Sequence, residues 1–209
     1  MSFVLRGEKY FATISTIFKI MEKQLSFTSE GYEIEGLIDI RSKTRGVVIS
    51  HPHPLYGGDM YNIVVESIAR AYRKKDYTTL RFNFRGVGKS QGRYDKGVGE
   101  QTDVAAALYH LRQTGIDKLD LAGYSFGAWV NALVSCKDTS MDHMIMVSPP
   151  VGVIDFQPVT RIDRLHLAVT GSRDEFAPAD KIEELVPIWN DQSYFEIIAG
   201  ADHFYGGHP

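Results

Sequence analysis

The residues of this chain best suited to do chemistry centre on Ser125, within the stretch Gly123-Tyr-Ser-Phe-Gly127. An apolar run, Leu119–Ala122, comes before it and a small, apolar segment, Ala128–Ser135, comes after it. This pattern predicts a buried strand, a tight turn and then a helix. Such a turn strains its central residue, and a glycine on each side avoids clashes. Ser125 is therefore a candidate nucleophile at the positive end of a helix dipole.

A serine hydroxyl is a weak nucleophile, so it needs a base and an acid that orients the base. The run His166–Thr170 is typical of a strand, and Asp174 lies in the loop that follows it. The run Tyr194–Ile198 is typical of another strand, and His203 lies in the loop beyond. We interpret Ser125 as nucleophile, His203 as general base and then acid, and Asp174 as the carboxylate that orients the imidazole.

Other residues of the same types compete for these roles. Glu175 is the nearest rival of Asp174. Among the seven histidines, His143 and His166 open predicted strands, which places them at the far edge of a parallel sheet in structural roles. Only His203 lies in a loop beyond the last predicted strand, so it is the best candidate for the base.

Strands alternate with helices in the elements that must position these residues. Two strands, Gln24–Thr28 and Tyr32–Arg41, flank a Glu30-Gly31 turn and predict an antiparallel hairpin. Further strands are predicted over 46–50, 77–84, 118–122, 144–147, 165–170 and 194–198, and helices over 60–75, 103–113, 128–135 and 179–188. The fold class is therefore α/β, a mostly parallel twisted sheet with helices on both faces. Such sheets bind ligands at the carboxyl ends of their strands.

The composition narrows the class of protein. A chain of 209 residues with 44% hydrophobic residues and a net charge of −3 predicts a globular fold with a large core. No basic face or arginine-rich run supports nucleic-acid binding, and no apolar run is long enough to span a membrane. Cys136 is the single cysteine, so no intrachain disulfide forms, and we expect a cytoplasmic protein with Cys136 buried and inert.

The first residues stand apart from this pattern. Tyr10, Ile14, Ile17, Phe18 and Met21 fall at helical spacing. We therefore divide the chain into an amino-terminal extension or amphipathic helix, residues 1–22, and a catalytic domain, residues 23–209.

Taken together, these motifs resemble those of the α/β-hydrolase superfamily, whose triad members follow the order Ser, Asp, His. More narrowly, the chain is similar to small lidless serine hydrolases related to dienelactone hydrolase. The matching stretches are 50–60, 82–92, 123–127 and 201–204, and the resemblance covers residues 25–203. Dienelactone hydrolases proper have a cysteine nucleophile where this chain has Ser125, so their substrate does not carry over. The family also continues into a final helix, whereas six residues follow His203 here.

The resemblance implies a serine hydrolase that cleaves small carboxylic esters or thioesters through an acyl-enzyme intermediate. It implies a small-molecule ester as partner, with no metal and no organic cofactor, and it leaves the oligomeric state open. A lid is often inserted after the strand that ends near Ser148. Here the connection to the next strand is residues 149–164, which is too short for a helical cap. Two alternatives stay open: a peptidase of prolyl-oligopeptidase type, and a noncatalytic member that binds ligands or partners.

The expected oxyanion hole needs two backbone N–H groups. Phe126, directly after the nucleophile, supplies one. Proline has no N–H, so the loop 51–58 offers His53, Leu55 or Tyr56 as the other, and the resemblance points to His53. Four aromatic residues near these loops predict an apolar substrate pocket: Tyr56, Trp129, Phe176 and Phe204.

One stretch imitates a nucleotide-binding motif. Gly86-Val-Gly-Lys-Ser90 ends like a P-loop, but Asn83 stands where the first glycine is required. We interpret it as a strand-to-helix loop, in which Arg85 pairs with Asp95 or Asp103.

Overall fold

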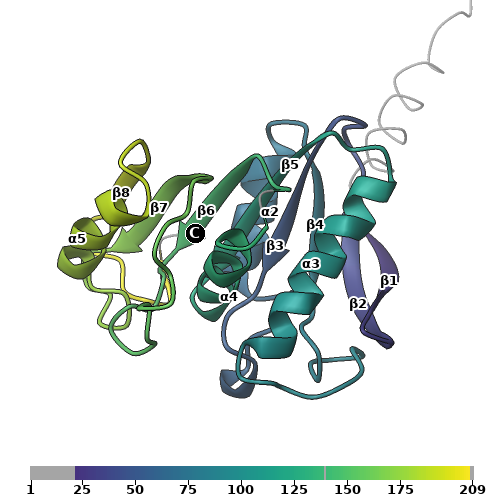
Figure 1. The fold of residues 1–209 in the computed structure, drawn as a ribbon, viewed down its shortest axis with the longest axis horizontal. Helices are drawn as coiled ribbons and strands as arrows, with labels where there is room; N and C mark the ends of the chain where they lie inside the picture. Colours follow the sequence, from purple (N-terminus) through teal and green to yellow (C-terminus); the bar gives the residue numbers. More distant parts are fainter. Residues whose placement is uncertain (1–21, 139, 208–209) are drawn as a thin grey trace, which may run out of the picture.

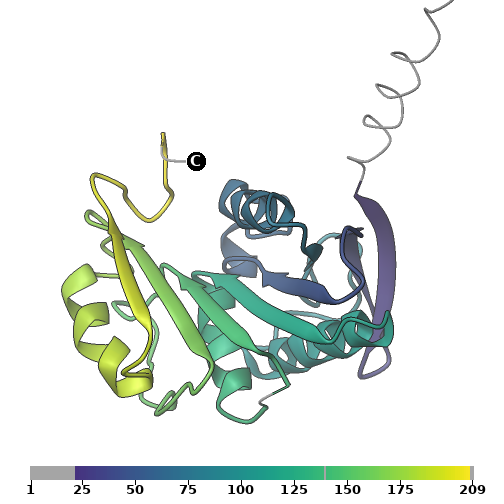
Figure 2. The ribbon, with the colours of Figure 1, turned by 90° about the horizontal axis from the view of Figure 1, so that it is seen from above.

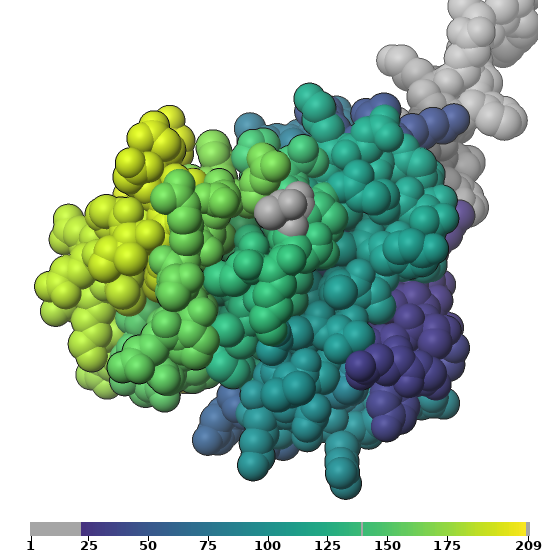
Figure 3. All heavy atoms as spheres, in the orientation of Figure 1, coloured from purple at the N-terminus to yellow at the C-terminus, as the bar shows by residue number. Residues whose placement is uncertain are grey.

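The computed structural model describes residues 22–138 and 140–207. The predicted extension, residues 1–22, lies outside the described residues except for its last member, so the proposed boundary stays a prediction. The described strands form one eight-stranded sheet in the order β1-β2-β4-β3-β5-β6-β7-β8. The purple hairpin and the yellow-green α5 lie at opposite ends of the molecule (Figure 3).

A hairpin forms one edge of the sheet, as predicted. Strands β1 (Lys23–Ser29) and β2 (Tyr32–Asp39) pair antiparallel. Glu30 and Gly31 between them have φ values of 47° and 85°, the left-handed conformation that suits a two-residue turn. Strand β2 also pairs antiparallel with β4 (Thr78–Phe82).

The rest of the sheet is parallel, so the carboxyl ends of its strands lie at one edge. The parallel strands are β3 (Arg45–Ser50), β4, β5 (Lys118–Tyr124), β6 (His143–Val147), β7 (Leu165–Gly171) and β8 (Tyr194–Ile198). The central strands are short runs of mostly apolar residues because helices bury them, whereas the edge strand β8 is mostly exposed or half-buried.

Helices cover both faces of the sheet (Figures 1 and 2). Helix α2 (Ile63–Arg73) lies on one face, and α3 (Val98–Gln113), α4 (Phe126–Ser135) and α5 (Ala179–Trp189) lie on the other. Residues 148–164, between β6 and β7, contain turns but no helix. Within the described residues, none of the helices is long and apolar enough to cross a bilayer.

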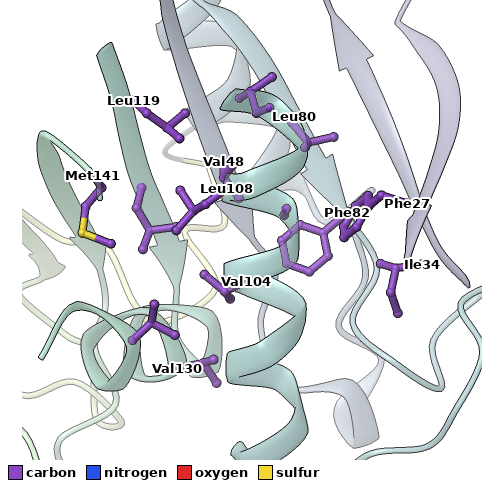
Figure 4. Packing of buried hydrophobic residues seen from close by; sticks show 14 of the residues in the cluster. Phe27, Ile34, Val48, Leu80, Phe82, Val104, Leu108, Leu119, Val130 and Met141 are labelled. Carbon is purple, nitrogen blue, oxygen red and sulfur yellow. The ribbon is translucent and has the colours of Figure 1, made fainter. Parts of the chain in front are cut away.

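The largest cluster of buried side chains joins the hairpin, the sheet and two helices (Figure 4). Val104 and Leu108 of α3 pack against strand residues such as Val48 and Phe82. Side chains this close-packed hold the strand ends in fixed relative positions. The fold therefore places the loops at the carboxyl edge on a rigid support.

Helix α3 begins five residues before its predicted start at Asp103. The carboxylate of Glu100 explains the difference, because it accepts hydrogen bonds from the backbone N–H groups of Asp95 (2.8 Å) and Gly97 (2.8 Å). These bonds satisfy donors at the helix start, as in a capping box, although the cap residue is a glycine. The helix also carries Asp103 inward, where its carboxylate pairs with Arg85 at 2.9 Å. Of the two predicted partners of Arg85, Asp103 is the one that forms this ion pair.

The prediction that Cys136 is buried was wrong. Helix α4 ends at Ser135, and Cys136 follows it as the exposed cap residue. Its thiol lies 3.2 Å from the carbonyl oxygen of Arg161. The helix ends at the predicted residue, so Cys136 lies just beyond it.

Candidate functional site

Ser125 occupies the turn between β5 and α4, with φ 54° and ψ −120°. This left-handed conformation is strained for a residue with a side chain. A Cβ at Gly123 would lie 2.6 Å from Gly127 backbone atoms, and one at Gly127 would lie 2.6 Å from the carbonyl oxygen of His51. Both glycines are therefore needed to bring the turn this close to its neighbours, and the turn presents the Ser125 hydroxyl at the carboxyl edge.

Three predicted residues come together at that edge. The Nε2 atom of His203 lies 2.9 Å from the Oγ atom of Ser125. On the other side of the ring, Nδ1 lies 2.9 Å from each carboxylate oxygen of Asp174. Ser125, Asp174 and His203 follow β5, β7 and β8 respectively, so three parallel strands position the hydrogen-bonded chain.

Asp174 is held in place by more than the imidazole. Its Oδ1 atom accepts the backbone N–H groups of Phe176 (3.0 Å) and Ala177 (2.8 Å). Burial alone would raise the pKa of the Asp174 carboxyl, but the hydrogen bond with His203, the nearby Ser148 hydroxyl and the Ala177 N–H outweigh it. The pKa therefore lies below its ordinary value, and Asp174 is a carboxylate at neutral pH.

The rival acid does not reach the imidazole. Glu175 is exposed, whereas Asp174 is 4% exposed. His143 and His166 lie at the starts of β6 and β7, at the opposite edge of the sheet as predicted, and their rings lie 5.0 Å apart. His143 there contacts Asp120 at 3.1 Å.

The loop after β3 lies beside Ser125 and is fixed by two histidines. His51 is fully buried; its Nε2 accepts the N–H of Phe84 at 3.0 Å, and its Nδ1 lies 2.6 Å from the Pro52 carbonyl oxygen. Burial lowers the pKa of His51 to about 4, so the ring is neutral at physiological pH. His53 precedes a short 3₁₀ helix, η2 (Pro54–Tyr56), and its Nδ1 accepts the N–H of Leu55 at 3.2 Å.

The backbone N–H groups of Phe126 and His53 donate no hydrogen bond to another backbone group among residues 22–138 and 140–207. Phe126 is the first residue of α4, where a helix leaves its N–H groups without an internal partner. The rings of His53 and Phe126 lie 4.8 Å apart, so the two residues are neighbours. Both line the cavity described next.

A cavity of about 940 Å³ opens onto Ser125 and His203. A volume of this size suits a small organic molecule. All four aromatic residues predicted for the pocket line it: Tyr56, Trp129, Phe176 and Phe204. Tyr56 is 87% exposed and stands at the rim, whereas the Trp129 Nε1 is anchored to the carbonyl oxygen of Asp155 at 3.2 Å.

Sequence reasoning missed several residues of the cavity wall. Tyr94 and Lys96, from the loop between β4 and α3, line it, as do Pro150, Val153 and Ile154 from the β6–β7 connection. Nothing in the spacing of these loops marks which side chains turn inward. Gly97 marks a turn in the sequence, but only the structure shows that it makes room for Trp129, since a Cβ there would lie 2.3 Å from the ring.

The P-loop-like stretch forms a turn around an acidic side chain. The Oε1 atom of Glu35 accepts the N–H of Lys89 at 2.6 Å, and a Cβ at Gly88 would lie 2.1 Å from the same oxygen. A carboxylate in this position repels a phosphate. Within the described residues, no group of three or more His, Cys, Asp or Glu side chains could hold a metal ion.

Comparisons with known proteins found relatives in both sequence and structure. No protein-family model matches the chain. The uncharacterized protein RP471 of Rickettsia prowazekii (strain Madrid E) is 39% identical over 168 residues, which cover 76% of this chain and 71% of the relative.

Solved structures extend the similarity to the whole fold. An alpha-beta serine hydrolase homologue from Coxiella burnetii is 34% identical, with a TM-score of 0.81, and the match covers 99% of this chain and 94% of that one. XC6422 from Xanthomonas campestris, a serine hydrolase without a lid, is 29% identical, with a TM-score of 0.80 and coverage of 90% and 88%.

Proposed function

We propose, given that the chain belongs to the α/β-hydrolase superfamily, that it is a serine hydrolase cleaving small carboxylic esters or thioesters. The observation that carries this proposal is the 2.9 Å separation between His203 Nε2 and Ser125 Oγ. A base at this distance can take the hydroxyl proton as the oxygen attacks a carbonyl carbon.

The reaction follows from this geometry in two halves. In the first, Ser125 Oγ attacks the ester carbonyl, its proton passes to His203 Nε2, and the imidazolium returns it to the departing alcohol or thiol. The carbonyl carbon is then bonded to Ser125 as an acyl ester. In the second half, His203 takes a proton from water, the hydroxide attacks the acyl ester, and Ser125 Oγ leaves with the proton.

Asp174 acts on the imidazole and does not touch the substrate. Its carboxylate holds Nδ1–H, which leaves Nε2 as the basic nitrogen facing the hydroxyl. It also stabilises the imidazolium that forms in each half-reaction. The lowered pKa of Asp174 supports this role, because the negative charge is present at neutral pH.

The negative charge that develops on the carbonyl oxygen needs hydrogen-bond donors. We assign this role to the N–H groups of Phe126 and His53. The helix-start position of Phe126 and the proximity of the two residues support the assignment. Donors of this kind contribute about 3 kcal/mol each to the stability of the transition state.

Labelling with a fluorophosphonate and measuring intact mass tests the nucleophile. We expect one adduct on the wild-type protein and none on Ser125→Ala. Ser135→Ala, which removes a serine hydroxyl at the other end of α4, serves as the matched control and should be labelled like wild type. A wild-type protein that stays unlabelled at millimolar probe would overturn the assignment and favour a noncatalytic role.

Paired substrates separate an esterase from a peptidase. A p-nitrophenyl ester and a p-nitroanilide with the same acyl group differ only in the bond that is cleaved. We expect Ser125-dependent release of p-nitrophenol, with anilide turnover at least a hundredfold slower. Comparable rates for the two would favour the peptidase alternative.

A further inference from the structure

We propose that Lys96 is a specificity-determining residue that selects esters carrying a carboxylate in the part of the molecule held by the cavity. This inference rests on the proposed hydrolase function and narrows its substrate class. Lys96 lies in the loop between β4 and α3 and lines the cavity that contains Ser125 and His203.

Lys96 has a backbone conformation that its own residue type does not favour. Its φ is 54°, in the left-handed region where a non-glycine residue is strained. The Glu100 carboxylate holds it there by accepting the N–H groups on both sides, those of Asp95 and Gly97, at 2.8 Å each. Glu100 is 0% exposed. The buried Glu100 carboxylate therefore fixes the backbone on both sides of Lys96.

No negatively charged side chain accompanies the positive charge of Lys96 among the described residues that line the cavity. Among those described lining residues, Lys96 is the one charged side chain apart from any charge on the histidines, and none of them is Asp or Glu. Among residues 22–138 and 140–207, its ammonium group takes part in no ion pair or hydrogen bond. A bound ligand would therefore meet a free cation and no competing carboxylate.

Tyr94 adds a neutral donor from the same loop. The Nδ1 atom of His53 accepts the Leu55 N–H, so the proton of the neutral ring is on Nε2 and is donated to the Tyr94 oxygen at 3.1 Å. The Tyr94 hydroxyl proton is then left without an acceptor among the described residues. Tyr94 and Lys96, two positions apart, together place two donors on one part of the cavity wall.

A pair of esters matched in shape measures the preference. Mono-p-nitrophenyl adipate carries a carboxylate where p-nitrophenyl hexanoate carries a methyl group. The readout is the ratio of kcat/KM for the adipate to kcat/KM for the hexanoate. Because Lys96 is exposed, an ion pair there is screened, and we expect Lys96→Met to lower the ratio about fivefold, mainly through KM.

Two control variants make the result specific. Lys96→Arg keeps the positive charge and should retain the wild-type ratio. Lys89→Met removes a lysine from the same β4–α3 connection but outside this cavity, and it should leave the ratio unchanged. The effect of Lys96→Met should also shrink in 1 M salt. An unchanged ratio in Lys96→Met would overturn the proposal.

A wrong hydrolase assignment can be told apart from a wrong Lys96 assignment. If neither ester shows turnover that depends on Ser125, the proposed function is wrong, and binding of monomethyl adipate measured by calorimetry then decides the role of Lys96. We expect Lys96→Met to weaken that binding about fivefold, and Lys89→Met to leave it unchanged. Equal affinities for wild type and Lys96→Met would overturn the Lys96 proposal on its own.

Discussion

The hydroxyl of Tyr124 donates a hydrogen bond to the backbone carbonyl oxygen of His203 at 2.6 Å. Tyr124 directly precedes Ser125, so the residue beside the proposed nucleophile holds the backbone of the proposed base. A second bond secures the same loop, because the hydroxyls of Tyr205 and Ser148 lie 2.8 Å apart. These contacts anchor the His203 loop to β5 and to the end of β6.

Replacing Tyr124 with phenylalanine should therefore loosen the base. We expect Tyr124→Phe to lower kcat for a p-nitrophenyl ester about tenfold, because small displacements of a catalytic group are costly. The free energy of unfolding should fall by about 1 kcal/mol. Tyr77→Phe, at the opposite edge of the sheet, is the control and should retain wild-type kcat. A Tyr124→Phe enzyme with unchanged kcat would show that the bond does not position His203.

The choice between the two adjacent carboxylates can be tested directly. Asp174→Asn should lower kcat about ten-thousandfold, since the amide favours the wrong tautomer of His203. Glu175→Gln alters an exposed side chain and should keep kcat within about twofold of wild type. Steady-state kinetics on a p-nitrophenyl ester gives both values. The opposite ranking would transfer the role to Glu175.

Buried His51 should make the protein sensitive to acid. Its pKa is about 4 in the folded protein and about 6.5 in the unfolded chain, so between these values the unfolded chain binds the extra proton. Stability should thus fall as the pH is lowered from 6.5 to 4, with about 3 kcal/mol lost through this residue.

Urea unfolding at pH 7 and pH 4.5 measures this loss. We expect His51→Gln to be less stable than wild type at pH 7 but to lose less stability on acidification. His166→Gln, at an exposed position, should follow the wild-type pH dependence. Parallel pH profiles for wild type and His51→Gln would contradict the prediction.

The glycine beside Lys96 makes room for the wall of the cavity. Gly97 and Gly115 have similar φ values, 86° and 91°, but a Cβ meets the Trp129 ring at 2.3 Å only at Gly97. Gly115→Ala should cost about 1 kcal/mol from backbone strain alone. Gly97→Ala should cost about 2 kcal/mol more, because the indole must move.

Thermal or urea unfolding of the two variants gives the comparison, and tryptophan fluorescence reports the indole directly. We expect a changed emission spectrum for Gly97→Ala and a wild-type spectrum for Gly115→Ala. Equal destabilisation of the two variants would mean that Trp129 shifts without cost.

Much of the fold was predictable because local patterns and tertiary structure agree. The strand over Tyr194–Ile198 has the predicted bounds, and the hairpin turn lies at Glu30 and Gly31. The meeting of Ser125, Asp174 and His203 was also predictable, since residues that follow parallel strands share one edge of the sheet.

What could not be predicted depends on individual side-chain contacts that no repeating pattern marks. The start of α3 depends on Glu100, whose two bonds make a glycine-rich stretch helical. The pairing of Arg85 with Asp103 depends on the depth at which that helix packs. Lys96 and Tyr94 could not be assigned to the cavity, because the direction of a loop side chain is not encoded in a repeating pattern.

The connection between β6 and β7 carries no helix above the cavity. Under the proposed function, selectivity would come from the walls of the cavity that the described residues form, and the 148–164 connection supplies no helix that has to swing aside before each turnover. A change of substrate range would then require substitutions in the loops that line the cavity, such as those that bear His53 and Lys96.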